Sequence, residues 1–126
     1  YGSKDYDNEN DNSNIVYLNL FNKSFLFMGD SGINRESIFV MNNKIGNIDV
    51  LKVGHHGSKT SSDKNFIDEI KPKYSVISVG ANNRYRHPNK EVLDNLDNSK
   101  IYRTDQDGSI MFKIKNNKLK IETCSP

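Results

Sequence analysis

The sequence feature that most restricts the fold is the short apolar run Val50–Val53, which stops at Gly54 and is followed by His55, His56 and Gly57. A short valine-containing run bounded by turn formers is typical of a buried strand. Two imidazoles therefore follow the end of a strand, on a rigid support. Successive side chains of an extended chain point to opposite faces, so the two histidines have different roles unless the turn at Gly57 redirects one of them. Because histidine is the commonest metal ligand and a frequent general base, this segment is the first candidate site; the alternative is a polar loop with two ordinary histidines.

Further apolar runs alternate with helical patterns along the chain. Strands are predicted at 15–20, 24–28, 50–53, 74–79, 101–103, 109–115 and 118–123. Hairpin turns are predicted at Asn22-Lys23 and at Asn116-Asn117, and a further turn at 105–108. This order predicts an α/β (α+β) fold with mostly one sheet, helices on one face and a terminal hairpin.

Three helices are predicted between these strands. The first covers 35–42 and is expected to bury Ile38, Phe39 and Met41. The second starts at a cap on Ser61 or Ser62 and runs to Ile70, and the third covers 90–96.

The composition is that of one domain or a piece of one. The 126 residues are 34% hydrophobic with no tryptophan, which permits a modest core and exceeds the range of disordered chains. A net charge of +2 does not by itself indicate nucleic acid or membrane binding, although four lysines lie between Lys113 and Lys120. Residues 1–14 are polar and are predicted to be a flexible segment.

The single cysteine, Cys124, excludes an intramolecular disulfide framework and a cysteine-based zinc motif. Any metal ion would have to be held by histidine, aspartate or glutamate. Neither a membrane-spanning apolar run nor a signal-peptide pattern is present, so the chain itself is expected to be soluble.

Candidate functional residues follow the ends of three predicted strands. Asp30 follows the strand 24–28, the two histidines follow 50–53, and a loop with Arg84, Arg86 and His87 follows 74–79. Ligands of sheets with helical layers bind in the crevice beyond strand ends. A carboxylate and two imidazoles at one crevice would suit zinc or manganese.

Four segments together match a known pattern. They are Phe27–Asp30, Asp49–Ser62, Ile77–Gly80 continued by Asn82–Pro88, and Tyr102–Gly108. On these segments the chain resembles the second half of a metallo-β-lactamase-fold hydrolase, and more specifically the C-terminal domain of ComEC-type DNA-uptake (competence) membrane proteins. The resemblance implies that residues 15–126 are the C-terminal half of an αβ/βα sandwich, with a mixed sheet, outer helices and a terminal hairpin.

The chain departs from that family in two places. The family's loop usually has glycine where this chain has Arg86, which adds bulk and charge beside His87. The principal metal signature of the fold, His-x-His-x-Asp-His, is absent, and the resemblance implies that it belongs to an upstream half.

The resemblance also implies roles for individual residues. Asp30 corresponds to the carboxylate that bridges two metal ions, and His56 to a late histidine ligand. His55 would stabilise the transition state from beside the metal site, although the two histidines could exchange roles, and His87 would bind phosphate or protonate a leaving oxygen. Three basic side chains are implied as phosphate contacts: Lys59, Arg84 and Arg86.

The function implied by the resemblance is a metal-dependent nuclease or phosphodiesterase acting in DNA uptake with two divalent ions, zinc or manganese. Because this chain supplies too few ligands, it is expected to bind metal weakly and to be inactive alone. The expected partners are the N-terminal half of the domain, DNA or another phosphoester, and a second copy of the chain. The parent protein is expected at the bacterial cell membrane with this domain outside the cytoplasm, or to be secreted.

Two alternatives remain open at the level of sequence. One is a stand-alone metallohydrolase that acts on another phosphoester or on a small molecule. The other is a non-catalytic scaffold or DNA-binding module that keeps the fold. The upstream half would distinguish them, since an intact histidine signature there is required for catalysis.

Overall fold

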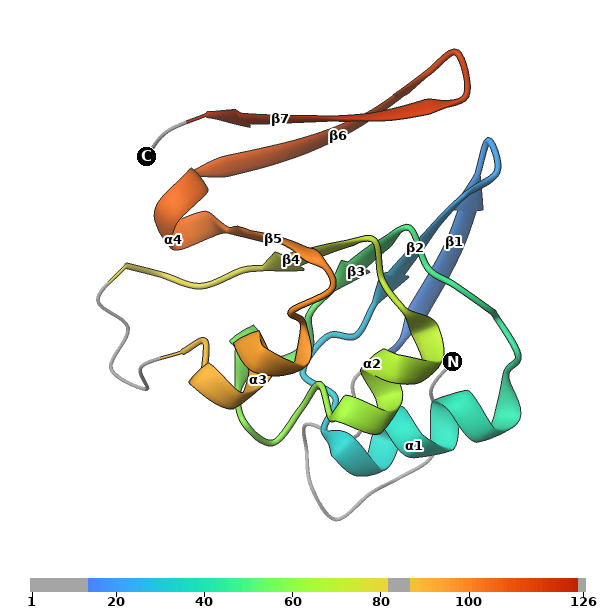
Figure 1. The fold of residues 1–126 in the computed structure, drawn as a ribbon, viewed down its shortest axis with the longest axis vertical. Helices are drawn as coiled ribbons and strands as arrows, with labels where there is room; N and C mark the ends of the chain where they lie inside the picture. Colours follow the sequence, from blue (N-terminus) through green and yellow to red (C-terminus); the bar gives the residue numbers. More distant parts are fainter. Residues whose placement is uncertain (1–13, 82–86, 125–126) are drawn as a thin grey trace.

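The centre of the structure is a mixed five-stranded sheet with the strand order β1-β2-β3-β4-β5 (Figure 1). The computed structural model describes residues 14–81 and 87–124. The strands of this sheet are β1 (Val16–Leu20), β2 (Lys23–Phe27), β3 (Val50–Lys52), β4 (Tyr74–Ile77) and β5 (Lys100–Arg103). β1 pairs antiparallel with β2, and the remaining neighbours pair in parallel. The expected mixed α/β fold class is thereby confirmed.

Helices cover one face of this sheet (Figure 1). They are α1 (Ile33–Asn42), α2 (Lys64–Ile70) and α3 (Lys90–Asn95). The core lies between the helices and the sheet, and it includes Leu26, Leu51 and Ile77 from the strands and Phe66 and Leu96 from the helical side. Phe66, Ile67 and Ile70 of α2 are buried, as are Val92 of α3 and Leu96 after it, whereas Leu93 is only partly buried.

A separate two-stranded sheet covers part of the opposite face (Figure 1). It is the hairpin of β6 (Ser109–Lys115) and β7 (Lys118–Cys124). Its contact with the main sheet centres on Phe112, whose ring lies 6.5 Å from that of Phe25 and 6.4 Å from those of Tyr74 and Tyr102. Aromatic pairs at these separations and steep interplanar angles add to the free energy of burial.

The two hairpin turns have left-handed backbone conformations. Asn116 and Asn117 have φ of 52° and 61°, which confirms the predicted turn, because a two-residue turn of this hand requires positive φ twice. The first turn is Phe21-Asn22, with φ of 48° and 64°, and the prediction of Asn22-Lys23 was wrong by one residue. Pairing of Leu20 with Lys23 leaves only these two residues in the loop.

The buried face of α1 differs from the prediction. Phe39 is buried, but Met41 is 81% exposed and Ile38 is only half-buried. Arg35 and Glu36 are buried in their place. The Glu36 carboxyl group accepts hydrogen bonds from the backbone N–H groups of Ser62 (2.5 Å) and Asp63 (3.0 Å), which explains why the helix turns Glu36 inward.

The predicted cap of α2 was also wrong. The residue that caps α2 is Asp63, and its side chain makes no capping hydrogen bond. Ser61 and Ser62 are buried before the helix begins. Glu36 of α1 accepts the N–H groups of Ser62 and Asp63, so it anchors the residues that lead into α2 without capping the first turn of the helix.

The segment predicted as a turn at 105–108 contains a short helix, α4 (Thr104–Asp107). The hydroxyl of Thr104 accepts a hydrogen bond from Val79 N–H and donates one to Val79 C=O, each at 2.8 Å. Arg103 pairs with Asp105 at 2.6 Å. Thr104 therefore ties α4 to the backbone that follows β4.

Replacing Thr104 by valine is expected to destabilise the protein by about 2 kcal/mol, because a half-buried backbone N–H and C=O would both lose their partner. The measurement is urea unfolding followed by circular dichroism. Thr104→Ser keeps the hydroxyl and is expected to remain close to the original stability. Equal losses in the two variants would contradict this account.

Some predictions fall on residues outside the described ranges. The predicted flexible segment 1–14 lies outside these ranges except for Asn14. Arg84 and Arg86, the predicted phosphate contacts, also lie outside them. Within 14–81 and 87–124, none of the helices has the length and hydropathy that a membrane span requires.

Candidate functional site

The candidate site lies at the edge of the sheet where the parallel strands end. His55 N–H donates to Gly29 C=O at 2.9 Å, which joins the segment after β3 to the segment after β2. Asn89 N–H donates to Gly57 C=O at 2.8 Å, which joins the start of α3 to the same place. Three segments far apart in the sequence therefore meet at one edge, as the sequence analysis expects for Asp30, the histidine pair and His87.

Two glycines permit this close approach. A Cβ atom on Gly54 would lie 3.1 Å from Ser31 O and 3.3 Å from Met28 Cβ. A Cβ atom on Gly57 would lie 2.5 Å from Pro88 Cβ, and Gly57 also has φ of +79°, which side chains rarely adopt. The histidine pair is thus held between Gly54, where a side chain would be tight, and Gly57, where the structure has no room for one.

His55 and His56 are the two central residues of a short 3₁₀ segment, η2 (Gly54–Gly57), and do not continue the strand in an extended conformation. Both have left-handed backbone conformations, with φ of 49° and 54°. Such values are uncommon outside glycine and are enriched at functional sites. The simple alternation of an extended chain therefore does not describe this pair, and the turn redirects the side chains.

The imidazole of His56 is oriented by a backbone carbonyl. Its Nδ1 lies 2.7 Å from Ser78 O, so Nδ1 carries the proton and donates to that oxygen. In the neutral ring the other nitrogen, Nε2, has a free lone pair, and it lies 3.9 Å from Asp30 Oδ1. Both side chains are about half exposed, at 53% and 50%. This is the arrangement in which histidine serves as a metal ligand beside a carboxylate.

His55 connects the other two histidines. Its ring centre lies 6.5 Å from that of His56 and 6.1 Å from that of His87. Its Nδ1 is 3.3 Å from the hydroxyl oxygen of Thr60. Burial, and then the nearby charges that His55 and His56 can carry, lower the pKa of His87, which favours its neutral form at this edge.

The hydroxyl residues after the histidines brace the loop. Ser61 donates to Gly54 C=O at 2.9 Å, and Ser58 and Thr60 share a hydrogen bond of 3.0 Å. Their roles in the described structure are those of turn residues. They hold Gly54 and the loop around the histidine pair in place.

Two groups at this edge were not predicted from the sequence. Ser78 acts through its carbonyl oxygen, which no side-chain pattern reveals. Lys52 is half-buried on β3, where burial lowers its pKa and the charge of Asp30 raises it, so the two groups lie within electrostatic range. A lysine inside an apolar strand was the available signal for Lys52.

Lys59 lies exposed in the loop between η2 and α2. Among the described residues, no group of three or more histidine, cysteine, aspartate or glutamate side chains is arranged to hold a metal ion. Asp30 and His56 are thus a pair of candidate ligands, one part of a complete coordination shell.

No family model matches the chain. It is 40% identical over 112 residues to ComE operon protein 3 of Bacillus subtilis, and 35% identical over 88 residues to Recombination protein 2 of Haemophilus influenzae. It is also 42% identical over 65 residues to Competence protein ComA of Neisseria gonorrhoeae. These matches support a competence and DNA-uptake family.

The alignments with these competence-family relatives cover 86%, 70% and 50% of this chain. They cover only 14%, 11% and 9% of the respective relatives. The chain is therefore similar to one small part of much longer proteins.

Proposed function

We propose that this chain is part of a metal-dependent nuclease or phosphodiesterase domain that acts on DNA during uptake. The domain corresponds to the C-terminal half of a metallo-β-lactamase-like sandwich, and a further half supplies the remaining ligands. The parent protein acts at the bacterial cell membrane. Homology to competence proteins supports the DNA-uptake context, and the local chemistry of the sheet edge supports the reaction class.

The observation that carries the proposal is the relation between His56 and Asp30. Two donor atoms that are each about 2.1 Å from one ion can be up to about 4.2 Å apart. The separation of 3.9 Å between His56 Nε2 and Asp30 Oδ1 falls within that limit. The hydrogen bond from Nδ1 to Ser78 O leaves the Nε2 lone pair available, so the donors fit a divalent ion such as zinc or manganese.

A pair of divalent ions in such a site would supply a water of lowered pKa and positive charge that stabilises the phosphoryl oxygens. Asp30 and His56 would hold the ions. His55 lies between His56 and His87 and can stabilise negative charge when protonated. His87 can bind a phosphate oxygen or give a proton to the leaving oxygen.

The test is cleavage of labelled single-stranded DNA in the presence of Mn²⁺ or Zn²⁺, with the full chain and with a polypeptide extended upstream into its parent protein. Cleavage is expected only from the extended protein. Asp30→Ala and His56→Ala are each expected to reduce it by about 100-fold or more, because each removes a ligand. Asp68→Ala, an exposed helical carboxylate paired with Lys64, is the matched control and is expected to retain activity.

Metal binding measured by calorimetry separates the remaining outcomes. An extended protein that binds metal through Asp30 but leaves DNA intact would refute DNA as the substrate and favour another phosphoester or a small molecule. An extended protein that neither binds metal nor cleaves DNA would refute the enzymatic proposal in favour of a scaffold or DNA-binding module.

A further inference from the structure

The outer face of the terminal hairpin carries a strip of lysines. Phe112, Ile114, Leu119 and Ile121 alternate with lysines along β6 and β7 and are half-buried, while the lysines are exposed. The lysines of this strip are Lys113, Lys115, Lys118 and Lys120. Because alternate side chains of a strand share a face, all four lie on the surface turned away from the main sheet.

The pairing register places these lysines opposite one another. Lys113 is the direct cross-strand partner of Lys120, and Lys115 is that of Lys118. Like charges directly opposite destabilise a hairpin. A hairpin that carries two such pairs gains stability when an anion binds over them.

The strip has one acidic neighbour. Glu122 accepts a hydrogen bond from Lys113 at 3.0 Å, and this contact with the charge of Lys113 lowers the pKa of Glu122. Within residues 14–81 and 87–124, no carboxylate oxygen lies within 4.0 Å of the amino group of Lys115, Lys118 or Lys120. Their positive charge is therefore available to an external anion.

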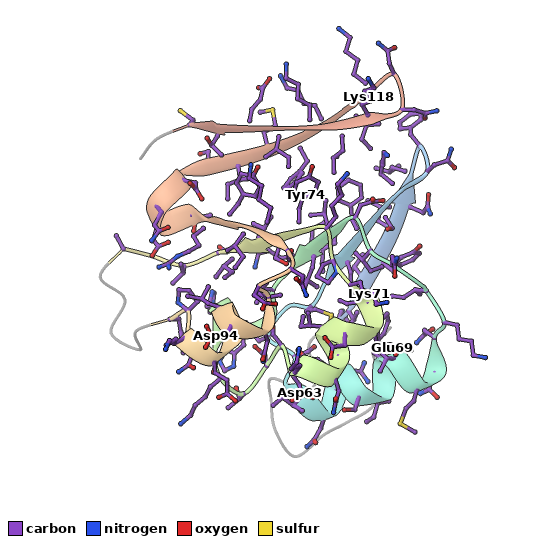
Figure 2. The ribbon with its side chains drawn as sticks, viewed as in Figure 1. Asp63, Glu69, Lys71, Tyr74, Asp94 and Lys118 are labelled. Carbon is purple, nitrogen blue, oxygen red and sulfur yellow. The ribbon has the colours of Figure 1, made fainter. Side chains whose placement is uncertain are left out.

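The helical layer carries acidic and basic side chains together. Figure 2 shows Asp63, Glu69 and Asp94 around α2 and α3 with Lys71 beside them, while Lys118 stands at the tip of the hairpin on the opposite side of the sheet. The modest net charge of +2 thus hides a positive surface on the hairpin. A polyanion would be attracted more strongly to this surface than to the helical one, where carboxylates offset the lysines.

We propose that the lysine strip of β6–β7 binds the phosphate backbone of single-stranded DNA. The identification of the bound polyanion as DNA rests on the proposed function. Alternate residues of a strand are about 6.8 Å apart, close to the rise of two nucleotides at the duplex value of about 3.4 Å each, so successive lysines can reach every second phosphate of a stacked strand. No aromatic residue lies on the outer face of the described hairpin, so the strip contacts the backbone without stacking on bases and binding does not depend on sequence.

The same face is poorly suited to a membrane. Peripheral insertion needs bulky apolar side chains beside the lysines, and the only large apolar residue on this outer face of β6 and β7 is Met111, which is 54% exposed. The aromatic and branched apolar residues of the hairpin point toward the main sheet. Backbone phosphates of DNA are therefore favoured over lipid phosphates.

The experiment measures binding of the full chain to fluorescently labelled oligothymidylate by anisotropy, between about 50 and 200 mM salt. The triple variant K115Q/K118Q/K120Q is expected to weaken binding roughly 100-fold at about 0.1 M salt, and to reduce the slope of log affinity against log salt by about 2. The matched control K44Q/K64Q/K71Q removes three lysines from the helical side and is expected to change binding little. Equal effects of the two triple variants would refute the strip as the binding surface.

A second variant shifts affinity in the opposite direction. Glu122→Gln frees Lys113, and it is expected to tighten binding about fivefold at about 0.1 M salt and to increase the slope by about 0.7. Weaker or unchanged binding would contradict the proposal. Binding to phosphatidylcholine vesicles that contain phosphatidylserine, without binding to oligothymidylate, would overturn it in favour of a membrane surface.

The readout separates this inference from the proposed nuclease activity. If DNA binds through the strip but the extended protein does not cleave it, the nuclease proposal is refuted and the inference about the strip stands. If the extended protein with K115Q/K118Q/K120Q cleaves DNA as efficiently as the unsubstituted extended protein, the role of the strip in DNA binding is refuted and the nuclease proposal stands.

Discussion

Replacing Gly57 by alanine is expected to lower the free energy of unfolding by about 2–5 kcal/mol, through backbone strain and overpacking together. The φ of +79° at this position disfavours any side chain, and the new Cβ atom would lie 2.5 Å from Pro88 Cβ and 3.0 Å from Pro88 Cα. Because the second contact is with backbone, the neighbour cannot move aside by rotating a side chain. Urea unfolding followed by circular dichroism measures the effect.

Two other glycines provide matched controls. Gly46 has φ of +67°, and a Cβ atom placed there would have no other atom within 4 Å, so Gly46→Ala tests backbone strain alone and is expected to cost about 1–2 kcal/mol. Gly80 also has open space for a Cβ atom and no positive φ, so Gly80→Ala is expected to change stability by less than about 0.5 kcal/mol. If Gly57→Ala cost no more than Gly46→Ala, contact with Pro88 would not restrict this position.

The second large effect is a dependence of stability on pH that arises from Glu36. Burial raises its pKa from 4.5 to about 8, although the N–H groups of Ser62 and Asp63 oppose this rise. The folded state therefore keeps its proton over a range in which the unfolded state has lost it. Stability from this group is fully present below about pH 4.5 and is lost as the pH rises through about 8, by as much as about 5 kcal/mol.

Unfolding by urea from pH 5 to pH 9 measures this dependence, and Glu36→Gln is the comparison. Glutamine does not titrate, so the decrease in stability with pH is expected to disappear in that variant, while histidine contributions remain in both proteins. The difference between the two curves isolates Glu36. If stability fell with pH equally in both proteins, the hydrogen bonds from Ser62 and Asp63 would outweigh the cost of burying a charged Glu36.

Local patterns in the sequence were sufficient to predict most of the fold. The run Val50–Val53 lies in a buried strand region, and the spacing of Phe66, Ile67 and Ile70 matches the buried face of α2. Periodicity is a property of neighbouring residues, so it can be predicted without knowing the tertiary contacts. The inward turn of Glu36 could not be predicted in this way, because its partners, Ser62 and Asp63, lie far along the chain in the segment before α2.

The candidate site divides in the same manner. The positions of Asp30, His56 and His87 after strand ends indicated one crevice, and the described structure brings their segments together. The left-handed backbone of the histidine pair and the carbonyl of Ser78 that orients His56 have no signal in residue type. The register of the hairpin places the four lysines directly opposite one another in two cross-strand pairs, and the number of lysines alone does not predict this.

The order of strands and helices, the glycine-bounded histidine pair and the lysine-rich hairpin all follow from the amino-acid sequence, because each depends on the chemistry of adjacent residues. Three other features are set by tertiary packing: the nitrogen of His56 that faces Asp30, the burial of charged residues of α1, and the side of the molecule that is positive. The physical reason is that hydrogen bonds and burial join residues distant along the chain, and only the packed sheet brings those residues within reach of one another.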